Sequence, residues 1–334
     1  MSAVSIINSW KKKDFKPFYW LEGEEEFFID EIMDYAEKHI LPESEASFNL
    51  TVFYGKDAEW PDILNACRRY PMFAERQVVL LKEAQQLKLI DKLEPYFENP
   101  LSSTIFIVSY KGKTLDGRSK LAKVLKKKGE VFASKKIYEN QLPSWTNGYL
   151  QSKGMRITPK ALALLVDHIG NDLGRIANEV NKLSLNIKDS EITEDEIEKF
   201  IGISKDYNIF ELQNAFSYKD AGKAIKIIQY LDANPKAVPQ VLILPTLYGY
   251  FTKIMSIYQM QDRSNNALKP LFYNNPYLVE QAMATVSNYS FPQLEKAVML
   301  LHRYNLRSVG IDNYGASFYS LLKELCYKII QNKD

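Results

Sequence analysis

The sequence predicts an α/β domain built on a parallel sheet, followed by two all-helical domains. Three observations support this fold class. Short apolar segments rich in β-branched residues alternate with amphipathic segments up to about residue 140, which is the pattern of a parallel sheet covered by helices. Beyond that point helical periodicity dominates and no strand is expected. Breaks in the helical pattern then divide the chain into expected domains of residues 1–140, 141–205 and 206–334.

The first domain is expected to contain five strands and four helices. Each strand is a short run of apolar residues bounded by polar or glycine residues, and each helix has apolar residues three and four positions apart. The expected strands are 18–21, 50–54, 77–81, 104–109 and 130–133, and the expected helices are 24–40, 60–70, 87–97 and 118–128.

The remaining segments carry clear helix-start signals. Thr158-Pro159 has the form of an N-cap followed by proline, and Thr193 with Glu196 has the form of a capping box. An apolar stripe marks a helix over residues 173–183, and another helix is expected at 142–151. Long apolar helices are expected at 238–258, 292–306 and 317–330, with breaks at residues 234–235, 274–276 and 290–292.

Composition and charge narrow the class of protein. No apolar stretch reaches the ~20 residues of a membrane span, and no secretory signal is expected at the start. Cys67 and Cys326 fit neither a disulfide framework nor a metal site, which favours a cytoplasmic protein. Residues 21–37 hold eight acidic and no basic residues, whereas residues 111–136 hold ten basic and two acidic ones. A solvated helix face is the favoured interpretation of the basic run, with a polyanion-facing role as the alternative.

The sequence gives no support for catalysis, a cofactor or a metal. Gly112-Lys113-Thr114 resembles the end of a phosphate-binding loop, but the glycine required five positions earlier is Ile107. At the first strand–helix junction, where such a loop would lie, residues 21–26 place carboxylates in the first turn of the helix, and these would repel a triphosphate. The three histidines fall in three different predicted domains, so a shared site is not expected.

Four motifs in order resemble the delta subunit of bacterial DNA polymerase III clamp loaders. They are Phe-Tyr-Trp-Leu-x-Gly-x-Glu at residues 18–25, the Pro-Met-Phe turn and apolar strand within 70–81, the strand 104–109 followed by Asp116 to Leu121, and the helix motif at 171–183. The third matches with one position shifted, and the C-terminal third matches mainly in helical character and length.

This resemblance implies an AAA+-like first domain that has lost ATP binding, and a non-catalytic subunit without a cofactor. It also implies a hetero-pentamer with tau/gamma and delta-prime subunits, held by a collar of C-terminal helical domains. Such a subunit binds and opens the beta sliding clamp so that the clamp can be loaded on primed DNA. No membrane contact is implied.

The resemblance assigns clamp binding to Pro71, Met72, Phe73 and Ala74. The residues themselves favour the same interpretation, because a turn between a helix and a strand lies at the surface, and exposed Met and Phe side chains suit a partner's pocket. The alternative is that both side chains fold back onto the core. Tyr314, just before the last expected helix, occupies the position where the family can place an aromatic ring near DNA; a packing role is its alternative.

The sequence supports three alternative functions less well. A delta-prime-like subunit would typically carry a cysteine zinc cluster and a Ser-Arg-Cys motif, and the sequence has neither. A nucleotide-dependent enzyme would have to use Lys113 and Thr114, which Ile107 argues against. A helical adaptor unrelated to replication is favoured only if the chain does not bind a clamp.

Overall fold

The computed structural model describes residues 2–187 and 191–332. The chain forms two compact units, Met1–Ile137 and Tyr138–Asp334. The second unit contains both of the predicted helical domains, and the division between them at residue 205 stays a prediction.

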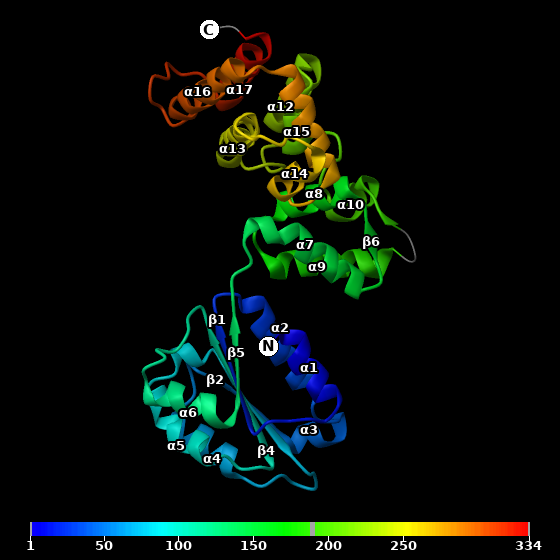
Figure 1. The fold of residues 1–334 in the computed structure, drawn as a ribbon. Coiled ribbons are helices and arrows are strands. Elements are labelled where there is room, and N and C mark those ends of the chain that lie inside the picture. The colour runs from blue at the N-terminus through cyan, green and yellow to red at the C-terminus, as the bar shows by residue number, and fades with distance from the viewer. Residues whose placement is uncertain (1, 188–190, 333–334) are drawn as a thin grey trace. The chain divides into compact units, whose positions relative to one another are not determined.

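The first unit is built on a five-stranded parallel sheet with the order β2-β3-β4-β1-β5 (Figure 1). All five predicted strands are confirmed, most of them one or two residues longer than expected. In the central register, Leu21 lies opposite Ser109 on one side and Phe132 on the other. The strands are β1 (Phe18–Gly23), β2 (Leu50–Tyr54), β3 (Gln77–Lys82), β4 (Thr104–Lys111) and β5 (Glu130–Ser134).

Helices cover both faces of this sheet because alternate residues of each buried strand point to opposite faces. Along β1, Tyr19 and Leu21 pack with α1 and α2, whereas Phe18 and Trp20 pack with α4, α5 and α6. The helices of this unit are α1 (Ala3–Lys11), α2 (Glu26–His39), α3 (Glu43–Asn49), α4 (Trp60–Arg68), α5 (Glu94–Glu98) and α6 (Lys120–Lys128).

The structure corrects one predicted helix of this unit and adds two that the sequence analysis missed. The segment 87–97 is a 3₁₀ turn (Ile90–Leu93) followed by the short α5, because Leu89 adopts a left-handed backbone conformation that interrupts a helix. Helices α1 and α3 were not predicted; α1 begins after a capping box formed by Ser2 and Ser5.

The second unit is largely helical, and the two caps that the sequence predicted are confirmed. The Thr158 side chain accepts a hydrogen bond from the amide of Ala161, and Thr193 forms its capping box with Glu196. The helices are α7 (Leu142–Ser152), α8 (Pro159–Ile169), α9 (Leu173–Asn186), α10 (Glu194–Ile201), α11 (Ile209–Ser217), α12 (Ala221–Ala233), α13 (Gln240–Tyr258), α14 (Asn265–Leu268), α15 (Pro276–Asn288), α16 (Phe291–Ser308) and α17 (Phe318–Gln331).

The expectation that no strand follows residue 140 is wrong. Two-residue strands, β6 (Arg156–Ile157) and β7 (Glu191–Ile192), pair in parallel, and the Thr158 amide donates a 2.9 Å hydrogen bond to the Ile192 carbonyl. Strands this short have no periodicity that a sequence could reveal.

Helix α13 is long and apolar enough to cross a membrane by length and composition. In this unit, however, one side of it packs into the helical core through residues that include Leu247, Phe251 and Ile254, and α16 lies against it. Its other side exposes Val241, Leu242 and Tyr248.

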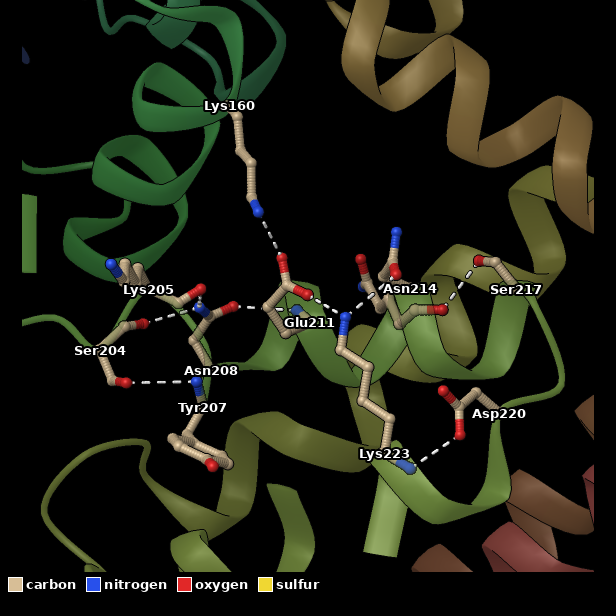
Figure 2. Close-up of polar contacts among 11 residues, drawn as sticks. Lys160, Ser204, Lys205, Tyr207, Asn208, Glu211, Asn214, Ser217, Asp220 and Lys223 are labelled. Atoms are coloured by element: carbon tan, nitrogen blue, oxygen red, sulfur yellow. Dashed lines mark hydrogen bonds and ion pairs between the residues drawn. The ribbon is translucent and has the colours of Figure 1, made fainter. Parts of the chain in front are cut away.

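A buried carboxylate joins three helices of the second unit (Figure 2). Glu211 on α11 lies 2.8 Å from the ammonium of Lys160 on α8 and also pairs with Lys223 on α12. Burial alone would raise the pKa of Glu211, but its bonds to the two lysines hold that pKa below the ordinary value. The segments on either side of residue 205 are therefore tied by a charged contact.

Candidate functional site: an exposed apolar tip

The connection between α4 and β3 lies at the edge of the sheet where β3 and β4 begin. Helix α4 ends at Arg68 and strand β3 begins at Gln77, so eight residues make the turn. Residues 70–74 of this turn are called the tip below. The tip contains the four residues to which the sequence analysis assigned clamp binding.

The structure places the two large side chains of the predicted site in solvent. Phe73 is 100% exposed and Met72 is 53% exposed, and the neighbouring Tyr70 is 76% exposed. Pro71 and Ala74 are half-buried and form the foot of the tip. The alternative that Met72 and Phe73 pack onto the core is therefore wrong. Exposed aromatic and Met side chains are the kind that protein interfaces use as anchors.

The backbone of the tip adopts a conformation that is costly for its sequence. Phe73 has a φ of 51°, in the left-handed region that residues other than glycine seldom occupy. Such a residue costs about 1–2 kcal/mol. Neighbouring contacts must offset this cost and hold the turn in shape.

Asn49, the last residue of α3, supplies one such contact. Its Oδ1 accepts a 2.7 Å hydrogen bond from the Met72 amide, and its Nδ2 donates a 3.0 Å bond to the Met72 carbonyl. The same Nδ2 lies 3.3 Å from the carbonyl of Glu45. Asn49 is only 2% exposed, so these bonds satisfy a side chain that water cannot reach.

Gln77 and Thr104 anchor the base of the turn. The Gln77 Nε2 donates to the carbonyls of Ala66 and Arg69 and to the Thr104 hydroxyl, which in turn donates a 2.9 Å bond to the Cys67 carbonyl. These bonds satisfy the last carbonyls of α4, which have no partner within the helix. The tip therefore extends from a rigid base.

Sequence reasoning did not find Asn49 or Gln77 as parts of the site. Asn49 offered one signal, since it is a polar residue directly before a largely apolar strand. Gln77 was predicted only as the first residue of a strand. Their partners lie many residues away in the chain, and periodicity carries no information about such contacts.

At the opposite edge of the sheet, the first strand–helix junction is closed by contacts within the chain. The Gly23 amide donates to the carbonyl of Lys113 and its own carbonyl accepts from Gly112, at 3.1 and 2.9 Å. A carboxylate oxygen of Glu22 accepts hydrogen bonds from the Trp20 indole and from the Leu115 amide. The segment 112–115, which includes Gly112-Lys113-Thr114, thus forms hydrogen bonds with the junction itself.

Lys111 also bonds within this edge of the sheet. Its ammonium lies 2.7 Å from Asp30 and 2.9 Å from Glu83, and 4.0 Å from Glu26. Burial alone would lower the pKa of Lys111, but its bonds to Asp30 and Glu83 raise it above the usual value. Lys120 of the basic run pairs with Glu94, while the apolar side of α6 is buried. This arrangement agrees with the favoured interpretation of the run as a solvated helix face.

Tyr314 lies in the loop between α16 and α17 and is 97% exposed. Asn313 holds the loop by accepting a 2.9 Å bond from the Ala316 amide and donating a 3.1 Å bond to the Ala316 carbonyl. Because the Tyr314 side chain is exposed, the alternative that Tyr314 is a packing residue is wrong. Within the part of the chain that the structure describes, no group of three His, Cys, Asp or Glu side chains is placed to hold a metal ion.

Comparisons with known proteins agree with this architecture. Residues 19–135 match the family model described as "DNA polymerase III, delta subunit". The DNA polymerase III subunit delta of Bacillus subtilis is 26% identical over 236 residues, which cover 67% of this chain and 68% of the relative. The probable DNA polymerase III subunit delta of Aquifex aeolicus is 21% identical over 299 residues, covering 85% and 83%.

A solved structure shows the same fold. The Bacillus subtilis DNA clamp loader delta protein covers 98% of this chain and 99% of its own chain, with a TM-score of 0.54 and 22% identity. The chain is therefore similar in sequence to DNA polymerase III delta subunits, and it shares its fold with a DNA clamp loader delta protein.

Proposed function

We propose that this chain binds and opens the beta sliding clamp, with Met72 and Phe73 acting as a wedge in a pocket of the clamp. The observation that carries this proposal is the exposed Phe73 and Met72 at the end of an anchored turn. Burying a Met or Phe side chain contributes about 1.5–3 kcal/mol. Pro71 and Ala74 shape the foot of the tip.

In this proposal, opening of the clamp follows from a difference between the tip's affinities for the open and the closed clamp, and it needs no catalytic residue. In this mechanism the clamp ring has a closed form and a minor form in which one subunit interface is open. A tip that binds the open form more tightly than the closed form shifts the population towards the open form by the ratio of the two affinities. Subunits that bind ATP would control when the tip is presented.

The first strand–helix junction supports a subunit that neither binds nor hydrolyses ATP. Glu26 lies in the first turn of α2 and Glu25 is the N-cap residue, at a position where a triphosphate would need positive charge. Lys111, a nearby cation, bonds to Asp30 and Glu83. Ser134 lies so close to Gly23 that it leaves no room for a Cβ, so the presence of glycine at this position needs no bound ligand as its reason.

The partners in this proposal are the tau/gamma and delta-prime subunits of a cytoplasmic hetero-pentamer, which acts on primed DNA. The exposed apolar side of α13, with Val241, Leu242 and Tyr248, supports a helical collar that packs against neighbouring subunits. Apolar side chains gathered on one side of a helix suit burial against another protein.

The direct test is binding of the purified chain to the sliding clamp of its own organism, with and without ATP. We expect a stable complex whose affinity is the same in both conditions. An affinity that rises with ATP would contradict the nucleotide-independent part of the proposal. If no complex forms, clamp opening is the wrong function, and an adaptor role in another assembly becomes the better one.

We also propose that Tyr314 stacks on DNA at the primer–template junction within the assembled loader. Stacking of one base on an aromatic ring contributes about 1–3 kcal/mol, so Tyr314→Ala is expected to weaken binding of primed DNA by roughly 5- to 150-fold. Fluorescence anisotropy of labelled primed DNA with the whole loader measures this change. Tyr218→Ala, at another exposed tyrosine of the same unit, is the matched control and should leave the affinity unchanged. Equal affinities for wild type and Tyr314→Ala would remove Tyr314 from the DNA contact.

A further inference from the structure

We infer that Asn49 is a positioning residue for the tip: it fixes the Met72 backbone and thereby presents Phe73 to the clamp in a preformed pose. The inference rests on the proposed function of the tip. It assigns to α3 a part in clamp recognition, although Asn49 itself is buried and cannot touch the clamp.

The hydrogen bonds of Asn49 have a geometry that fixes its orientation. A backbone amide only donates and a backbone carbonyl only accepts, so Oδ1 must face the Met72 amide and Nδ2 the Met72 carbonyl. One side chain thus holds both polar groups of a single residue, as a neighbouring strand would. The residue held in this way immediately precedes Phe73, whose left-handed φ of 51° needs outside support.

Preorganisation is the physical reason that this support would affect affinity. A tip that samples many conformations in the free chain must be ordered on binding, and ordering the backbone of one residue costs about 1–2 kcal/mol. Exposed Tyr70, Met72 and Phe73 would also tend to collapse onto one another without an anchor. Holding Met72 lowers both costs before the clamp arrives.

A second interpretation gives Asn49 only a structural role, since its Nδ2 also lies 3.3 Å from the carbonyl of Glu45 in the first turn of α3. The two interpretations predict different couplings with Phe73. If Asn49 acts through the pose of Phe73, its replacement should matter little once Phe73 has been removed. If Asn49 only stabilises the fold, its effect on clamp affinity should be absent, or independent of Phe73.

The test is a double-mutant cycle of Asn49→Ala and Phe73→Ala, with clamp affinity measured by surface plasmon resonance on the full chain. We expect Asn49→Ala alone to weaken binding by roughly 5- to 30-fold, the range for one ordered residue. In the Phe73→Ala background we expect its further effect to be less than about twofold. Ser109→Ala is the matched control, because it removes a partly buried hydrogen bond that the Glu83 amide donates at the opposite edge of the sheet. It should leave clamp affinity unchanged.

A measurement on the wild-type chain keeps the inference testable if Asn49→Ala does not fold. The Met72 amide should exchange slowly with deuterium, whereas an amide of an unanchored surface turn would exchange freely. Free exchange at Met72, or equal effects of Asn49→Ala with and without Phe73, would overturn the inference alone. If Phe73→Ala itself binds the clamp as tightly as wild type, the proposed function fails, and the role of Asn49 fails with it.

Discussion

Replacing both Met72 and Phe73 by alanine is expected to abolish binding to the sliding clamp while leaving the chain fully folded. Each side chain contributes about 1.5–3 kcal/mol when it moves from water into a pocket. Loss of both therefore removes roughly 3–6 kcal/mol, a weakening of at least ~100-fold. Clamp affinity is measured by surface plasmon resonance, and folding by thermal denaturation of the free chain.

Stability should not change, because the side chains removed contribute little to the core. Phe73 is fully exposed, and alanine has the same Cβ, so the cost of the left-handed backbone is similar. The midpoint of thermal unfolding is expected to stay within about two degrees of that of the wild type.

A matched control removes exposed apolar side chains elsewhere in the same unit. Val4 on α1 and Leu89 before the 3₁₀ turn are 60% and 64% exposed, so Val4→Ala with Leu89→Ala tests whether any loss of surface apolar area weakens binding. This control should bind the clamp like wild type. If the tip variant also does so, the clamp contact lies elsewhere on the chain.

The parts of the fold that the sequence predicted correctly are those encoded by neighbouring residues. Strand 50–54 was placed at its observed bounds, and the capping box at Thr193 marked the start of α10. The exposure of Met72 and Phe73 was also predictable, since a proline-containing turn between a helix and a strand runs over the surface.

The parts that escaped prediction depend on contacts between distant residues. Asn49 and Met72 are 23 positions apart, and neither residue type indicates the pairing. The β6–β7 pair joins segments that each supply only two residues. The expected helix at 87–97 had suitable periodicity, but the left-handed Leu89 interrupted it, an effect of tertiary structure that propensity does not report.

A second large effect is expected from Gly23→Ala at the end of β1. Gly23 has a φ of +127°, a conformation that L-residues rarely adopt, and its Cα faces β5. A Cβ built there would lie 2.2 Å from the carbonyl oxygen of Ser134 and 2.4 Å from the Ser134 hydroxyl. Because Gly23 and Ser134 are partners in the β1–β5 register, relief of this clash must push the two strands apart. We expect a loss of about 3 kcal/mol or more in the stability of the first unit.

Hydrogen exchange of the β1 and β5 amides measures this loss in the first unit alone, which a single denaturation midpoint of a two-unit chain would not. Gly117→Ala is the matched control, since no heavy atom lies within 4 Å of a Cβ at that position. It should be neutral or stabilising by up to about 1 kcal/mol. In phosphate-binding folds a glycine at such a junction lets a ligand approach the backbone. Here the approaching group is Ser134, so the glycine is required for folding whether or not a nucleotide ever binds. A Gly23→Ala chain as stable as wild type would contradict that account and reopen the junction as a ligand site.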